Sequence, residues 1–180
     1  MYIDSHAHLN SEDFRTDLDE VLARAKEAGV ETTIVPGTNV ATSLEAIALS
    51  EKYPNLYACV GIHPHDASKS PSDALEQIER MTEHKKVVAV GEIGLDYHYD
   101  FSPRDVQLDT FRKQIQIAIR RDLPVVVHTR ESQADAIATV EEAVKANPGW
   151  RSEESSVHTR LPARRGVFHC FPGGPEEAGR

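Results

Sequence analysis

The feature that most constrains the fold is a regular alternation of short apolar segments with amphipathic ones. The apolar segments that predict β-strands span residues 2–9, 30–37, 56–64, 86–94, 124–129 and 165–171. Between them, apolar residues recur at helical spacing, as Val106, Phe111, Ile115 and Ile119 do in the fourth connection. This alternation predicts parallel strands covered by helices, either as an open doubly wound sheet or as a (β/α) barrel.

Length and composition are those of an ordinary globular protein. The 180 residues suffice for a single domain, 1–180, with a sizeable core, and 39% hydrophobic residues exclude global disorder. The net charge of −9 argues against a protein that coats nucleic acid through a broad basic surface. A local site that holds a few phosphates remains compatible with this charge.

The cysteines and the absence of a long apolar segment indicate a cytoplasmic location. Cys59 and Cys170 each lie in an apolar strand-like segment, which argues against a disulfide framework and for a reducing compartment. Strand alternation predicts that Cys170 faces away from His169, in the core. No segment approaches the roughly 20 apolar residues that span a bilayer, so no membrane association is expected.

Residues 147–165 break the alternation. This segment is polar, lacks periodicity and is longer than an ordinary connection, so we expect a flexible insertion. It contains a second copy of the "VHTR" found at 127–130, but this copy follows serines instead of valines. We therefore expect His158 to be a solvated loop histidine without a role in a site.

Glu92 lies at the end of the apolar segment "KVVAVGEIG". An unpaired buried carboxylate costs several kcal/mol, so Glu92 is expected to have a partner, a shifted pKa or a metal ion. Read alone, it could form a strand-end ion pair with an arginine.

Several histidines occupy comparable positions. His6 and His8 are two residues apart in a predicted strand, so both side chains can point to the same side and bind one ion. Glu92, His128 and His169 each lie at the carboxyl end of a different predicted strand, where (β/α) proteins place their chemistry. These ligand types suit Zn²⁺, Mn²⁺ or Fe²⁺, and Mg²⁺ if water and substrate complete the shell.

Each of these features also has a structural explanation. A lone His-x-His in a strand is more often incidental than metal-binding, and His128 alone could be a core histidine bonded to a backbone carbonyl. The positions taken together favour the metal site, because it would be a coincidence for several unrelated ligand-type residues all to lie at the carboxyl ends of strands.

The motifs "DSHAHLN", "GIHPH", "GEIGLDY", "VVVHTR" and "FHCF" occur in this order along the chain. Their order and spacing resemble those of the TatD-type metal-dependent deoxyribonucleases, within the amidohydrolase-like TIM barrel superfamily. The resemblance implies a TIM-like (β/α) barrel that uses two or more divalent ions, Mg²⁺, Mn²⁺ or Zn²⁺. It also implies hydrolysis of phosphodiester bonds in DNA, single-stranded or at ends, by water that two ions activate.

The resemblance further implies roles for individual residues. Matched motif by motif, His6 and His8 resemble ligands of one metal. Glu92 resembles a ligand that bridges both metals, and it is the expected catalytic residue. His128 and His169 resemble ligands of the second metal. His63, in "GIHPH", resembles the family histidine that helps to hold the substrate phosphate.

Other polar residues near these motifs each have two candidate roles. Arg130 could contact a phosphate oxygen or balance Glu131, and we favour the phosphate. Asn10 could bind substrate, with a helix-cap or turn role equally compatible. Asp96 could orient a ligand histidine through its other ring nitrogen or cap a turn.

The chain differs from the resemblance at its C-terminal end. Family members continue through a seventh and an eighth strand, whereas this sequence ends after about six β/α units. We therefore expect a truncated barrel whose first and last strands are open edges that favour self-association. We also expect weak or no nuclease activity from this polypeptide alone.

Two other functions remain open. Members of the same superfamily hydrolyse cyclic amides, lactones or esters, but they typically use a lysine as the metal bridge, and no lysine ends a predicted strand in that position here. The other alternative is an inactive truncated fragment that folds with a partner, or binds metal or nucleic acid without turnover.

Overall fold

The computed structural model describes residues 1–150 and 165–179. Its sheet contains six parallel strands in the order β1-β2-β3-β4-β5-β6, so each strand pairs with its neighbours in sequence. The strands are β1 (Tyr2–Asp4), β2 (Val30–Pro36), β3 (Leu56–Val60), β4 (Val87–Asp96), β5 (Val125–Arg130) and β6 (Gly166–Phe168).

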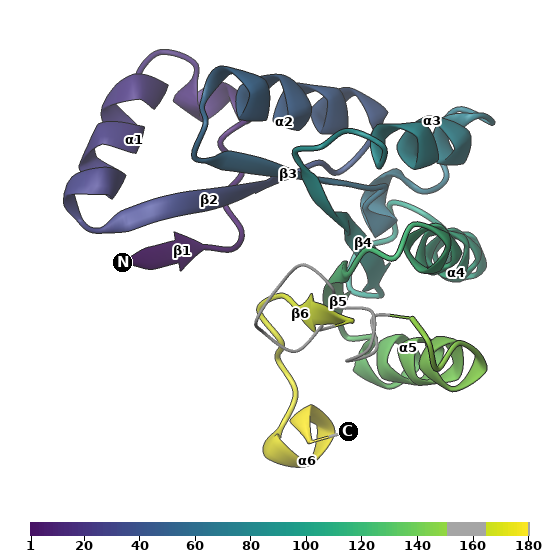
Figure 1. Ribbon diagram of the computed structural model, residues 1–180. Coiled ribbons are helices and arrows are strands. Elements are labelled where there is room, and N and C mark those ends of the chain that lie inside the picture. Colours follow the sequence, from purple (N-terminus) through teal and green to yellow (C-terminus); the bar gives the residue numbers. More distant parts are fainter. Residues whose placement is uncertain (151–164, 180) are drawn as a thin grey trace.

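The helices follow the strands and lie along the outer side of the curved sheet (Figure 1). They are α1 (Leu18–Glu27), α2 (Val40–Lys52), α3 (Ala74–Met81), α4 (Arg104–Arg120), α5 (Gln133–Ala146) and the short α6 (Pro175–Ala178). Two 3-10 helices, η1 (Glu12–Phe14) and η2 (Pro64–Asp66), lie in connections. A sequential strand order with helices on one side is that of an incomplete (β/α) barrel and excludes the doubly wound alternative.

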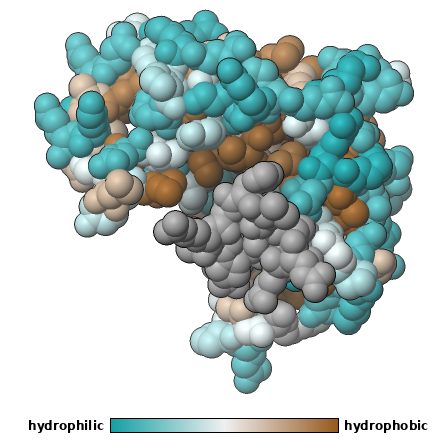
Figure 2. Space-filling view, in the orientation of Figure 1, coloured by the Kyte–Doolittle hydropathy of each residue, from teal (hydrophilic) through white to brown (hydrophobic). Residues whose placement is uncertain are grey.

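The main core lies between the sheet and these helices. Leu56, Val60, Ile93 and Val127 from the strands pack with Phe111, Ile115 and Ile78 from the helices. A second, smaller cluster of Cys59, Ala89 and Val126 involves the same strands. Figure 2 shows a mostly hydrophilic outer surface over the helices and hydrophobic residues along the inner side of the arc.

The first and last strands are shorter than the sequence predicts. The strand expected at 2–9 ends at Asp4, whose Oδ1 accepts the backbone N–H of His6 at 3.1 Å and so competes with the ladder. His6 and His8 consequently lie in the loop after β1. The strand expected at 165–171 ends at Phe168, and Cys170 has a φ of 46°.

This early end of β6 makes the prediction for Cys170 wrong. Strand alternation no longer applies beyond Phe168, and Cys170 is exposed instead of lying in the core. Its Sγ lies 3.2 Å from Nε2 of the adjacent His169.

The segment expected to be a flexible insertion, 147–165, lies largely outside the described residues, and so does His158. At its start, the side chain of Trp150 is buried and its indole N–H donates to the carbonyl of Leu123 at 2.9 Å. Within residues 1–150 and 165–179, no helix is both long and apolar enough to cross a membrane.

Candidate metal centre

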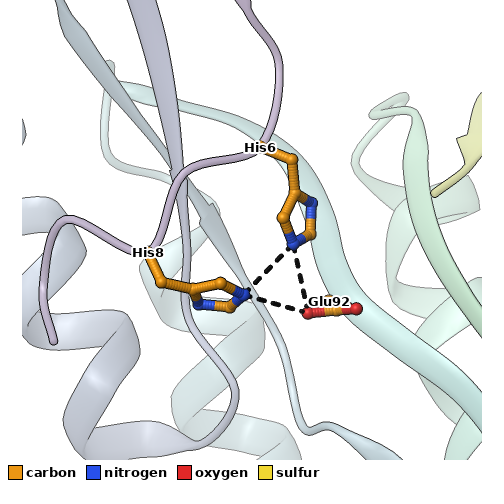
Figure 3. Close-up of side chains that lie close together, drawn as sticks. All are labelled: His6, His8 and Glu92. Carbon is orange, nitrogen blue, oxygen red and sulfur yellow. Dashed lines mark hydrogen bonds and ion pairs between the residues drawn. The ribbon is translucent and has the colours of Figure 1, made fainter. Parts of the chain in front are cut away.

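Two histidines from the loop after β1 converge on a glutamate from β4 (Figure 3). Nε2 of His6 lies 3.2 Å from Nε2 of His8, and these atoms lie 3.3 and 3.6 Å from Oε2 of Glu92. Three potential ligand atoms therefore lie close enough together to bind one metal ion.

The other oxygen of Glu92 faces a different histidine. Oε1 lies 3.2 Å from Nδ1 of His128, at the end of β5. His63, Glu92 and His128 form a second group whose ligand atoms lie close enough to hold an ion. Glu92 thus belongs to both groups and presents one oxygen to each.

The glycines of "GEIG" explain how Glu92 reaches this position. A Cβ at Gly91 would lie 2.6 Å from Cβ of Val126, and one at Gly94 would collide with the carbonyl oxygen of His128. Gly94 also has a φ of +133°, which side-chain-bearing residues rarely adopt. The two glycines therefore permit the close approach of β4 to β5 that places Glu92 beside His128.

Glu92 is ionised despite its burial. Its side chain is only 5% exposed, and burial by itself would raise its pKa. Hydrogen bonds from His128 and His6 outweigh this effect and hold the pKa of Glu92 well below its ordinary value. A buried carboxylate that stays charged is a suitable ligand for a cation.

His128 lies between two carboxylates. Its Nδ1 faces Glu92, and its Nε2 lies 3.1 Å from Oδ2 of Asp96. Burial would lower the pKa of His128, but the bonds with Glu92 and Asp96 raise it overall. Oδ1 of Asp96 also accepts the backbone N–H groups of His98 and Tyr99, so its turn-capping role is observed, and its contact with His128 is compatible with the orienting role.

His63 is buried beside His128, with ring centroids 4.6 Å apart. Its Nδ1 accepts the backbone N–H of His65 at 3.2 Å. Burial lowers the pKa of His63 to about 4, so the ring is neutral at pH 7. A neutral ring that accepts at Nδ1 carries its proton on Nε2.

These groups line one open pocket of about 450 Å³, whose described walls include His8, His63, Glu92, His128 and Arg130. Arg130 is exposed and its Nη1 donates to the hydroxyl of Tyr99 at 3.4 Å. Glu131, the alternative partner for Arg130, instead pairs with His98 at 2.7 Å. The guanidinium is therefore placed at the pocket, as the phosphate role requires.

Two predicted site residues belong to neither group of potential ligand atoms. The ring of His169 stacks on that of His6, with centroids 3.5 Å apart. The side-chain amide of Asn10 donates to the carbonyls of Pro36 and Thr42, so it links its loop to the end of β2 and the start of α2, which is neither a helix cap nor a local turn.

His65, the second histidine of "GIHPH", also belongs to the pocket, although no role was predicted for it. Its Nε2 lies 2.9 Å from Oδ2 of Asp96, and its ring lines the pocket. The second histidine of that motif was the available signal. Tyr99, which also lines the pocket, follows "GEIGLDY" by two residues and has no comparable signal.

The donor set fits divalent ions. Two imidazole nitrogens 3.2 Å apart next to an ionised carboxylate need a proton or a cation between them. Nδ1 of His6 is buried without a hydrogen-bond partner among the described residues, so this ring is not held in place by a hydrogen bond at that atom. Imidazole with carboxylate suits Zn²⁺ or Mn²⁺.

Comparison with known proteins identifies a family. The model of the TatD-related DNases matches residues 3–180. An uncharacterized metal-dependent hydrolase of Bacillus subtilis, YabD, is 39% identical over 178 residues, which are 99% of this chain and 64% of the relative. The 3'-5' ssDNA/RNA exonuclease TatD of Pectobacterium carotovorum is 36% identical over 97% of this chain and 61% of the relative.

Solved structures agree with the fold. The TatD homolog YjjV of Escherichia coli superposes with a TM-score of 0.84 at 34% identity, over 99% of this chain and 63% of that one. An uncharacterized amidohydrolase from Saccharomyces cerevisiae has the same fold, with a TM-score of 0.76 at 22% identity. The chain therefore spans less than two thirds of the length of these relatives.

Proposed function

The chain belongs to the family of TatD-related DNases, and on this premise we propose that it is a metal-dependent deoxyribonuclease that hydrolyses phosphodiester bonds of DNA. The observation that carries the proposal is the position of Glu92. One of its oxygens faces His6 and His8, and the other faces His128. A carboxylate shared in this way is what a centre with two adjacent ions requires.

We assign the ligands from this arrangement. His6, His8 and Glu92 would hold one ion, and Glu92 with His128 would hold the second, with His169 a further candidate from the sequence. Divalent ions at such a centre supply an activated water and stabilise the charge that develops on the phosphoryl oxygens. The proposed ions are divalent: Mg²⁺, Mn²⁺ or Zn²⁺.

Asp96 positions His128. In a centre that holds its ion, the Nε2 proton of His128 would be donated to Asp96, and Nδ1, on the side of Glu92, would be the ligand atom in place of its proton. Asp96 also contacts His65, so one carboxylate orients two rings of the pocket wall.

His63 and Arg130 would bind the scissile phosphate. The neutral ring of His63 has Nε2–H as its free donor, because Nδ1 already accepts the backbone N–H of His65. This tautomer favours a hydrogen bond to a phosphate oxygen over metal ligation. Arg130 would add a charge-assisted bond from the exposed side of the pocket.

Hydrolysis of a cyclic amide, lactone or ester is the main alternative. Among the described residues that line the pocket, none is a lysine, and the bridging position is occupied by Glu92. These observations favour phosphodiester chemistry.

Cleavage of single-stranded DNA and hydrolysis of a lactone, each measured with Mn²⁺ and with EDTA, test the proposal. We expect EDTA-sensitive cleavage of DNA and no lactone hydrolysis. EDTA-sensitive lactone hydrolysis alone would support the alternative, and metal binding without either activity would support an inactive fragment.

Two further expectations belong to the proposal. The free state of Cys59 and Cys170 supports a reducing, cytoplasmic environment. The outer edges of β1 and β6 have no strand partner within the described residues, which supports self-association of the isolated chain.

A further inference from the structure

An aromatic stack flanked by cations extends outward from the metal pocket. The rings of Tyr99 and Phe101 are stacked, with centroids 5.2 Å apart and an interplanar angle of 18°. The guanidinium carbon of Arg130 lies 4.9 Å from the centroid of Tyr99, and Nζ of Lys69 lies 5.4 Å from that of Phe101. Tyr99 is one of the residues that line the pocket, so the stack begins beside the metal centre.

These rings are exposed, although their loop is firmly attached to the fold. Tyr99 is 38% and Phe101 50% exposed. The backbone N–H of Tyr99 donates to buried Asp96, and the hydroxyl of Ser68 donates to the carbonyl of Phe101 at 3.4 Å. Large aromatic surface held open in this way is not explained by packing of the core.

We infer that Tyr99 and Phe101 form a stacking platform for unpaired nucleobases of a single strand whose phosphate occupies the pocket. The inference rests on the proposed function and adds the surface that would recognise the substrate. Aromatic rings beside cations are the usual means of binding single-stranded nucleic acid without sequence preference. Paired bases are already stacked, so the platform would favour single strands over a duplex.

The net negative charge of the molecule means that binding of a nucleic acid strand would depend on local contacts. With a net charge of −9, long-range attraction to a phosphate backbone is weak. An exposed cation–π contact such as that of Arg130 contributes only about 2-fold to 5-fold to an equilibrium, whereas a stacked base contributes about 5-fold to 150-fold. A base can therefore displace either cation from its ring and leave it free to contact phosphate.

Binding of two probes in EDTA tests the platform without hydrolysis. The probes are a short labelled oligothymidylate and a strand of equal length in which the bases are replaced by abasic sites. For the native chain we expect the strand with bases to bind at least about 5-fold more tightly, as measured by fluorescence anisotropy. In the double variant Tyr99→Leu, Phe101→Leu, which keeps apolar bulk but lacks the rings, this ratio of Kd values should fall toward one.

A matched control removes an aromatic residue with the same kind of cation contact away from the site. Tyr57, near the start of β3, has Nζ of Lys86 4.4 Å from its ring centroid. Tyr57→Leu should keep the native ratio. A native chain without preference for bases, or a double variant that keeps the preference, would overturn the platform.

A second readout reports stacking directly. The chain contains one tryptophan, Trp150, which is buried, so Phe101→Trp adds one exposed fluorophore. Its emission should be quenched by the oligothymidylate and not by the abasic strand, and equal responses would contradict the platform. If the chain prefers the strand with bases but shows no metal-dependent cleavage, the proposed function alone is overturned. If the chain cleaves DNA but shows neither this preference nor the quenching, the platform alone is overturned.

Discussion

Nε2 of His128 lies 3.1 Å from Oδ2 of Asp96, so this carboxylate fixes the orientation of the imidazole ring. The carboxylate of Asp96 accepts a hydrogen bond from Nε2–H of His128, and Nδ1 of the same ring lies 3.2 Å from Oε1 of Glu92. In the proposed metal centre, Asp96 would act through His128, which would bind the ion by Nδ1.

Asp96→Asn should weaken metal binding by about 10-fold to 100-fold, the usual effect of losing a carboxylate that orients a ligand histidine. The fold should persist, because Gln107 binds the backbone N–H and carbonyl of residue 96 independently of its side chain. Metal titration by calorimetry measures the change. Asp135→Asn, which removes a carboxylate that accepts from Tyr97 at 2.8 Å outside the pocket, is the matched control. Equal affinities for the two variants would contradict the positioning role.

Gly94→Ala should destabilise the chain by about 2 to 4 kcal/mol, because it combines an unfavourable positive φ with overpacking against β5. The added Cβ would collide with the carbonyl oxygen of His128. Urea denaturation followed by circular dichroism measures the change. Gly149→Ala is the control, since its Cβ would meet nothing within 4 Å. A variant as stable as this control would show that β4 and β5 do not approach as described.

The alternation of apolar and amphipathic segments was visible in the sequence, and the parallel strands covered by helices that it predicts are confirmed. The TIM-like barrel, which the family resemblance implied, is confirmed as well. The ends of β1 and β6 were not predictable, because they depend on where Asp4 caps a backbone N–H and where Cys170 turns the chain. Apolar periodicity carries no information about either event.

Part of the candidate site was predicted from the sequence, but the reason given for the convergence of His6 and His8 was wrong. His6 and His8 do converge, but through a loop and not through strand alternation. The contacts of His65 and the stacking of His169 on His6 depend on distances between loops. Such distances are fixed by tertiary packing and leave no periodic trace in the sequence.

Arg120 joins α4 to Glu79 of α3 through two hydrogen bonds of 2.9 and 2.7 Å. The bonds from Arg120 hold the pKa of Glu79 below its ordinary value. Because the pKa of Glu79 is lower in the folded chain than in the unfolded chain, the ion pair stabilises the fold fully at pH values above the pKa in the unfolded chain. This stabilisation is lost as the pH falls through the pKa in the folded chain. Because the pair is exposed and screened, Arg120→Gln should cost only about 0.5 kcal/mol at neutral pH.

Urea midpoints of the native chain and of Arg120→Gln at about pH 7 and about pH 3 test this pair. The difference between the two proteins should shrink at the lower pH. Lys113→Gln, which breaks a pair with Asp109 within α4, is the control for losing a surface charge. A difference that is unchanged at low pH would contradict the contribution of the ion pair.

The edge strands should make the isolated chain associate. Ile3 of β1 is 65% exposed and Val167 of β6 is 50% exposed, and within residues 1–150 and 165–179 each of the two strands has a strand partner on one side only. Light scattering should show a mass above that of a monomer that rises with concentration, and Ile3→Lys with Val167→Lys should reduce it by charging both edges. A native chain that stays monomeric at all concentrations would refute self-association.

The bridging position of Glu92 is the central claim, and metal stoichiometry measures it most directly. Calorimetric titration of the EDTA-stripped chain with Mn²⁺ should give two ions per chain, and Glu92→Gln should weaken both sites together, because each oxygen of Glu92 faces one of them. Glu131→Gln, which removes an exposed carboxylate paired with His98, should bind as the native chain does. A Glu92→Gln variant that still binds two ions with native affinity would contradict the account.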